Sequence, residues 1–150
     1  MSQTVTLKQP TSRRFMTWML RSPLHVFMGG IMLITVTGRK SGRAISTPVN
    51  YARDGDTLLI ASKVDRTWWR NLRGGAKVTV LINGKTYQAD ASVIEDHATV
   101  ERELLRFFRL IKRTIAGIHL DKNGQPTKPD KFAQVAQSRV VIEITHLTEN

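Results

Sequence analysis

The chain has 150 residues, the size of one domain, and 41% of them are hydrophobic, so the sequence predicts a single folded domain rather than a disordered chain. It contains no cysteine, which excludes disulfides, thiolate metal ligands and a cysteine nucleophile. Its 23 lysines and arginines against 12 acidic residues give a formal net charge of +11, which favours an anionic partner: nucleic acid, anionic lipid, or a small ligand with phosphates or carboxylates.

The N-terminal segment, residues 1–30, is predicted to be helical after a first stretch without periodicity. Phe15, Trp18 and Met19 form an apolar stripe beside arginines. Such a stripe is typical of core packing, and contact with a membrane surface is the alternative. Pro23 and the glycine pair that follows fit the start and the end of a second helical turn. No apolar run reaches the roughly 18 residues of a spanning helix and no signal-peptide pattern is present, so we expect a cytoplasmic protein, with membrane association as the alternative.

Six strands are predicted, and they are joined mainly by hairpins. The predicted strands cover residues 31–37, 44–52, 57–62, 77–82, 85–94 and 139–147. Asn83-Gly84 is a favoured two-residue hairpin turn. Pro48 cannot donate a ladder hydrogen bond, so it marks an edge, a bulge or a strand end. The last strand is expected to pair with a distant one and close the sheet, which predicts an α+β fold: a small, mostly antiparallel six-stranded barrel with helices outside it.

Three helices are predicted after the first strands. A short helix follows residue 65, with a cap at Asp65 or Thr67 and a stop at the next glycine pair. Apolar residues then recur with a period of 3.6 from about Glu95 to Ala116, which predicts a long amphipathic helix. A further short helix begins at Pro129.

The tightest cluster of positive charge is the glycine-rich turn at residues 38–43, and no acidic residue precedes Asp54. The turn contains Arg39, Lys40, Ser41 and Arg43 between and beside Gly38 and Gly42. The glycines would let backbone N–H groups point into a concavity, and arginine can hold a phosphate with two parallel hydrogen bonds. We therefore predict an anion site here; the alternative is a solvated basic hairpin loop. The spacing is not that of a P-loop.

A second candidate site is the stretch 61–72, where a strand ends in small residues and a helix begins. Strand ends and helix starts present free N–H groups that suit phosphate or carbonyl oxygens. Trp68 and Trp69 are adjacent, so they cannot both face the core equally on a helix. One of them is expected to line a pocket in which a flat ring could stack, and the alternative is that both are core residues.

Several other kinds of site are not expected. Histidines 25, 97, 119 and 146 show no metal-ligand spacing, and neither a GxSxG elbow nor a Ser-His-Asp arrangement is present. Aromatic residues make up 7% of the chain and do not alternate with basic residues along any strand, so nucleic-acid binding is not expected either.

Between Pro23 and Ile94 the segments TGRKSGR, STPVNYARDGD, TLLIASK and WWRNL follow one another. In this order they resemble the deazaflavin (F420)-dependent nitroreductase and quinone reductase family. The resemblance implies a split β-barrel of the FMN-binding-like type that binds coenzyme F420. FMN, or another anionic planar ligand, is the alternative cofactor.

The resemblance also implies a cofactor site built from three segments. The loop that holds the cofactor's phosphate and acidic tail is matched by Arg39, Lys40, Ser41, Gly42 and Arg43. The strand along the deazaflavin ring is matched by Thr47, Pro48 and Val49. The positions that border the ring and the phosphate are matched by Ala61, Ser62, Lys63, Trp68 and Asn71.

The implied reaction is hydride transfer from the reduced deazaflavin to a quinone-like or other electron-poor planar acceptor. The cofactor supplies most of that chemistry, so the protein must bind the ring, leave one face open and exclude water. This fits the lack of an acid–base constellation, although it leaves the catalytic residues unassigned. A homodimer is expected by analogy with other split barrels. The alternative to an enzyme is a non-catalytic protein that binds an anionic ligand or a membrane.

Overall fold

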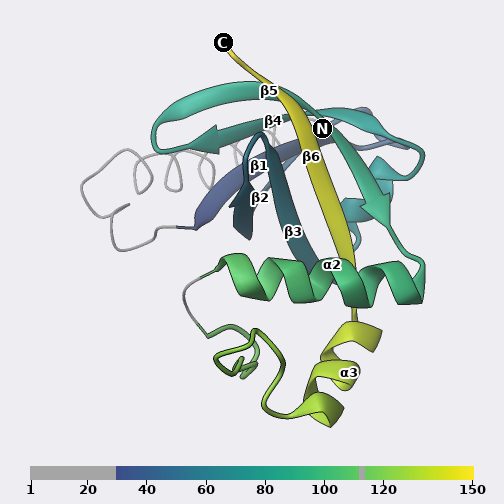
Figure 1. The fold of residues 1–150 in the computed structure, drawn as a ribbon. Helices are drawn as coiled ribbons and strands as arrows, with labels where there is room; N and C mark the ends of the chain where they lie inside the picture. The colour runs from purple at the N-terminus through teal and green to yellow at the C-terminus, as the bar shows by residue number, and fades with distance from the viewer. Residues whose placement is uncertain (1–29, 112–113) are drawn as a thin grey trace.

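The computed structural model of the protein describes residues 30–111 and 114–150 (Figure 1). The predictions for the N-terminal helices, including the apolar stripe of Phe15, Trp18 and Met19, fall outside these ranges. Among the helices that the structure describes, none has the length and apolar character needed to span a bilayer.

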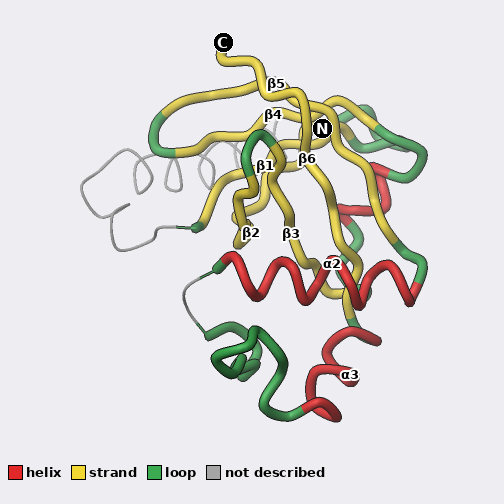
Figure 2. The backbone as a smooth tube through the Cα atoms, viewed as in Figure 1, coloured by secondary structure: helices red, strands yellow, loops and turns green. Residues whose placement is uncertain are grey.

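Six antiparallel strands form a closed barrel in the order β1-β2-β3-β6-β5-β4 (Figures 1 and 2). The strands are β1 (Ile31–Thr37), β2 (Ala44–Asp54), β3 (Thr57–Lys63), β4 (Ala76–Ile82), β5 (Lys85–Ile94) and β6 (Arg139–Glu149). The last strand lies between β3 and β5, so the predicted long-range pairing and the predicted barrel are confirmed. The β4–β5 turn has positive φ at Asn83 (49°) and Gly84 (81°), the backbone twist that a two-residue hairpin requires.

Within the described residues, three helical elements flank the barrel: the 3₁₀ helix η2 (Trp68–Leu72) and the α-helices α2 (His97–Leu110) and α3 (Pro129–Gln137). α2 crosses the outer face of the barrel and contacts β2, β3 and β6, and α3 packs against α2 (Figure 2). The prediction that the long helix continues to Ala116 is wrong, because Ile111 is already extended (φ −78°, ψ 146°). Ile111 and Ile115 still pack against the cluster beneath α2, so their spacing reflects burial rather than helix.

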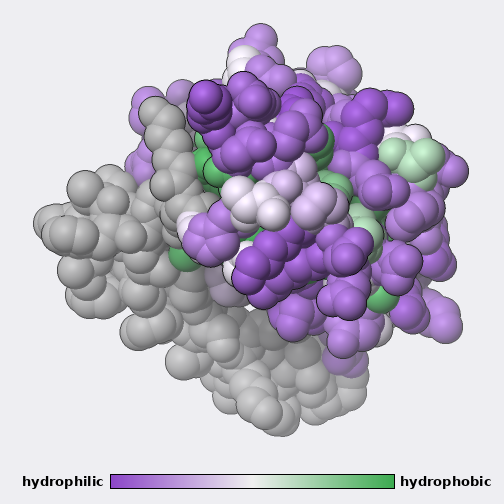
Figure 3. All heavy atoms as spheres, turned by 60° about the horizontal axis from the view of Figure 1, so that its bottom comes forward, coloured by the Kyte–Doolittle hydropathy of each residue, from purple (hydrophilic) through white to green (hydrophobic). Residues whose placement is uncertain are grey.

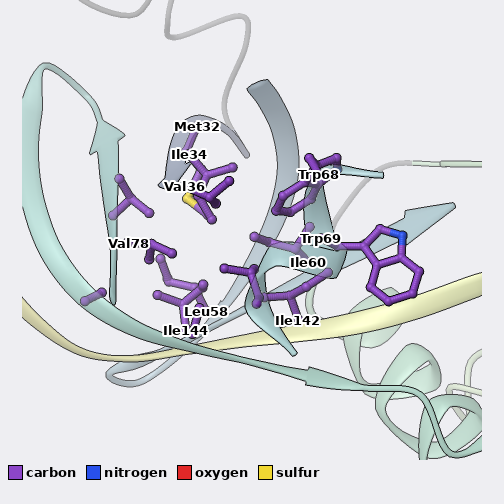
Figure 4. Close-up of a cluster of buried hydrophobic side chains, with 14 of the residues drawn as sticks. Met32, Ile34, Val36, Leu58, Ile60, Trp68, Trp69, Val78, Ile142 and Ile144 are labelled. Carbon is purple, nitrogen blue, oxygen red and sulfur yellow. The ribbon is translucent and has the colours of Figure 1, made fainter. Parts of the chain in front are cut away.

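The alternation of each strand divides the apolar residues between two cores. Buried inward-facing side chains of β1, β3, β4, β5 and β6 fill the barrel together with Trp68, Trp69 and Leu72 of η2 (Figure 4). Partly buried side chains of β2 pack against them. Outward-facing residues such as Leu59 and Val141 meet Leu104 and Phe107 of α2 in a second core. The second core holds α2 over one side of the barrel and so brings its aromatic residues next to β3.

Over part of its length β2 pairs with only one other strand of the described residues. It pairs with β1 from residue 44 to residue 50, but with β3 only from Tyr51 to Asp54. Pro48 lies in the stretch that lacks β3, and the hydrogen bond from Tyr51 to Gly30 sets a register in which the Pro48 nitrogen points away from β1. The prediction that Pro48 marks an edge is therefore confirmed, and β2 and β3 separate at this point.

The described surface is predominantly hydrophilic on the face shown in Figure 3. Among the described residues, Val64 is the large hydrophobic residue with a substantially exposed side chain (39%). It follows directly after β3, on the same side of the barrel as the opening between β2 and β3.

Candidate functional site

A cavity of about 210 Å³ opens where β2 and β3 separate. Its wall is formed by Pro48, Val49, Asn50, Ile60, Ala61, Ser62, Lys63, Arg66, Trp68, Phe107, Phe108, Ile115 and Arg139. The volume is below the roughly 300–1,000 Å³ that is usual for ligand pockets. The cavity therefore suits a flat ring whose remaining parts lie outside on the surface.

Six of the residues predicted for the site line this cavity. They are Pro48, Val49, Ala61, Ser62, Lys63 and Trp68. Thr47 does not line it, because it is buried within β2 opposite Ile34 of β1. The barrel thus brings together residues from two strands and one helix that were predicted to border the ring.

The two tryptophans differ in what they contact, although both are buried. Trp68 belongs to the barrel core and also lines the cavity. Trp69 donates its indole N–H to the Lys63 carbonyl at 3.2 Å, and the Arg73 guanidinium lies 5.0 Å from its ring centre. Trp68 therefore supplies the flat apolar wall, and Trp69 ties η2 to the end of β3.

The cationic loop, residues 38–43, lies against η2. The Arg39 amide donates to the Asn71 side-chain oxygen at 3.0 Å, and the Asn71 side-chain nitrogen donates to the Trp68 carbonyl at 3.0 Å. Asn71 thus joins the loop to the residue that walls the cavity. None of the loop residues lines the cavity itself, so the loop and the cavity are neighbouring parts of one surface.

The amides of both loop glycines are used in hydrogen bonds within the loop. The Gly38 amide donates to the Arg43 carbonyl at 2.8 Å, and the Gly42 amide donates to the Gly38 carbonyl at 2.8 Å. The glycines shape the loop instead: a Cβ at Gly38 would lie 2.6 Å from the Ser41 hydroxyl oxygen, and Gly42 has φ +70°. The loop's capacity to bind an anion therefore rests mainly on its side chains.

The cations around the site have no carboxylate partner in the part of the chain that the structure describes. This holds for Arg39, Lys40, Arg43, Lys63, Arg66 and Arg139, none of which forms an ion pair with a described residue. Elsewhere on the barrel, by contrast, Arg73 pairs with Glu95 and Arg106 pairs with Asp54. Cations without a described carboxylate partner, beside a small cavity with apolar and cationic lining, fit a cofactor with an anionic tail.

Arg139 was not predicted from the sequence, although it lines the cavity. It begins β6 and lies opposite Lys63 in the β3–β6 ladder. Its partial burial lowers the pKa of the guanidinium, and the charge of Asp65 opposes that effect. Only the pairing of β6 with β3, which joins residues 76 positions apart in sequence, brings Arg139 to the site.

Phe107 and Phe108 were also missed, because the helical periodicity marks them only as apolar. They form an edge-to-face pair with ring centres 5.5 Å apart, and both reach the cavity from α2. No signal in the sequence could place them there, since the packing of α2 on the barrel decides it.

The sequence model of the family described as F420H(2)-dependent quinone reductase matches residues 14–123, more than half of the chain. The chain belongs to this family. It is therefore an oxidoreductase that depends on coenzyme F420, as the resemblance implied. An F420H(2)-dependent quinone reductase of Mycobacterium tuberculosis strain H37Rv is 24% identical over 103 residues, which cover 65% of this chain and 67% of that protein.

Solved structures share the fold at low sequence identity. One, described as a 5-nitroimidazole antibiotic resistance protein from Bacteroides thetaiotaomicron, is 14% identical with a TM-score of 0.51; the match covers 83% of this chain and 78% of that one. Another, described as a domain-swapped dimer, is 17% identical with a TM-score of 0.51 and coverage of 94% and 98%. These likenesses establish the barrel architecture of the F420-dependent enzyme described here.

Proposed function

We propose that this F420-dependent enzyme reduces a quinone, with the deazaflavin ring bound in the cavity between β2 and β3. The observation that carries the proposal is a cavity lined in part by Trp68 and other apolar side chains, next to cations that pair with no described carboxylate. A quinone is a flat acceptor that can lie on the open face of such a ring. The family's description as quinone reductases supports the same acceptor.

The cofactor's anionic tail is expected to lie along the cationic loop. Arg39, Lys40 and Arg43 are exposed and carry the charge needed to hold a phosphate and carboxylates. Asn71 links this loop to Trp68, so tail binding and ring binding use one connected surface. Lys63 and Arg66 add two cations at the point where the cavity meets solvent.

The stretch of β2 that pairs with β1 alone among the described strands is suited to a ring that lies against it. Pro48 has no N–H, so at its position this edge presents no unpaired donor toward the cavity. Phe107, Phe108 and Ile115 add apolar side chains to the lining of the cavity. A flat molecule bound against them would displace water from the cavity.

When bound, reduced F420 supplies the hydride. The protein's own contribution is to orient the ring, hold the acceptor against it and keep water away from the exchange. No described residue has to act as a strong acid or base for that.

The test is an absorbance assay that follows the oxidation of reduced F420 in the presence of a panel of benzoquinones and naphthoquinones. We expect quinone-dependent oxidation by the full-length protein and none with the protein omitted. Titration with F420 and with FMN, followed by calorimetry, should show clearly tighter binding of F420. Tighter binding of FMN, or absence of turnover with every quinone, would contradict the proposed function.

We also propose that the protein forms a homodimer and acts in the cytoplasm. A structural neighbour described as a domain-swapped dimer supports a dimer for this fold. Light scattering coupled to gel filtration would test it, and a mass near the 17.0 kDa of one chain would reject it. Contact between the N-terminal segment and a membrane remains a prediction, which sedimentation with anionic vesicles would check.

A further inference from the structure

Two cations face the same side of the sheet at one end of the β3–β6 ladder. Lys63 and Arg139 are directly opposite each other, in register with Ala61 and Val141. Cross-strand neighbours of like charge destabilise a sheet. Such a pair is costly to the fold unless negative charge lies near it.

Arg139 is the more enclosed of the two. It is half-buried, whereas Lys63 is exposed, and it shares the cavity wall with Phe107, Phe108 and Ile115. Within the described residues it forms no ion pair, although the charge of Asp65 acts on it from a distance. A guanidinium beside an apolar wall has lost part of its hydration and gains strongly from any negative charge placed next to it.

The position of Arg139 separates it from the groups that hold the cofactor's tail. The tail-binding loop, residues 38–43, joins the site through Asn71 of η2. Arg139 instead comes from β6 and lines the cavity together with Phe107 and Phe108 of α2. A ring that lies along Pro48 and Val49 of β2 would leave the rest of the lining, Arg139 included, for the acceptor.

We propose that Arg139 binds the carbonyl oxygen of the acceptor and stabilises the negative charge that forms there during reduction. This inference rests on the proposed quinone reduction. A quinone becomes a hydroquinone by gaining two electrons and two protons. The transferred hydride brings both electrons and one proton, and water supplies the second proton. Between these two events the acceptor is an anion, and a guanidinium can donate hydrogen bonds to its oxygen without giving up a proton.

The test compares two ligands of nearly equal shape and different charge. The probes are 1,4-naphthoquinone, which is neutral, and 2-hydroxy-1,4-naphthoquinone, which is an anion at neutral pH and mimics the charged acceptor. Each is titrated by calorimetry into the protein saturated with oxidised F420. Arg139→Gln should weaken binding of the anion at least tenfold and change binding of the neutral quinone less than threefold, and Arg139→Lys should recover part of the loss.

The same variants are then assayed for turnover and for F420 affinity. Loss of one donor to a developing oxyanion lowers kcat by about 100-fold or more, so we expect Arg139→Gln to lower kcat to that extent while the Kd for F420 stays within threefold. Lys63→Gln is the matched comparison and should instead weaken F420 binding. Any of three results with Arg139→Gln would overturn the role given to Arg139. They are equal weakening of the binding of both quinones, an unchanged preference for the anion, and a loss confined to F420 affinity. Selective binding of the anion without any turnover would reject the proposed function and not the anion site.

Discussion

Replacement of Asn71 by alanine should loosen the cofactor site without touching the cavity wall. The Asn71 side chain makes two hydrogen bonds of 3.0 Å: it accepts from the Arg39 amide and donates to the Trp68 carbonyl. It thereby connects the cationic loop to the helix that carries the cavity's tryptophan. In the Asn71→Ala variant both connections are lost, and the loop is held by its own internal hydrogen bonds only.

The size of the effect follows from these two bonds. A neutral intramolecular hydrogen bond contributes about 0.5–1.5 kcal/mol net. The Arg39 amide lies at an exposed residue and can bind water in the variant, so its loss falls at the low end of that range. The free energy of unfolding should therefore fall by about 1–2 kcal/mol, which corresponds to a drop in Tm of roughly 2–8 °C for a chain of this size.

The Asn71→Ala variant should also bind F420 more weakly. In the variant, F420 binding has to order the cationic loop. A free-energy cost of about 1 kcal/mol for this raises the Kd for F420 about fivefold. Calorimetric titration and thermal unfolding measure the two effects separately, and Asn123→Ala, in the exposed turn after residue 121, is the matched control. An Asn71→Ala variant with unchanged F420 affinity would refute the view that the loop and the tryptophan helix act as one site.

Three further outcomes are expected. Replacing both Arg39 and Lys40 with alanine should weaken F420 binding and reduce its salt dependence, measured by titration at two ionic strengths. Leu104→Ala removes a fully buried side chain of the second core and should cost about 2–5 kcal/mol in urea unfolding, with a smaller loss for the half-buried Leu105→Ala. Hydrogen bonds from the hydroxyl and amide of Thr99 lower the pKa of Asp96 below its usual value of 3.8. The ionised Asp96 carboxylate therefore contributes its full stability well above pH 3.8, and this contribution is lost as the pH falls through the lowered pKa. Asp96→Asn should reduce this pH dependence of the free energy of unfolding.

Much of the barrel could be read from local sequence. Alternating apolar residues and Asn83-Gly84 specify the β4–β5 hairpin, because a period of two and a turn with positive φ are properties of neighbouring residues. Pro48 marks a free edge for the same reason: a missing N–H is a local property. The same reasoning failed at the end of α2, where Ile111 and Ile115 are partly buried without continuing the helix.

The cationic loop shows which features of a site a sequence motif can predict. The positions of Arg39 and Asn71 were matched to the family pattern separately, and the structure joins them by one hydrogen bond. The amides of Gly38 and Gly42 themselves are used in closing the loop. A sequence shows that glycine permits an unusual backbone, but not which partner the freed amide will find.

The sequence by itself determined the strands, the basic loop, the family and the dependence on F420, since each rests on residues close together in the chain. Only the tertiary structure decided what encloses the cavity: Arg139 arrives through the pairing of β6 with β3, and Phe107 and Phe108 arrive through the packing of α2. Those contacts join positions far apart along the chain, and their geometry follows from the closure of the barrel and the filling of its second core.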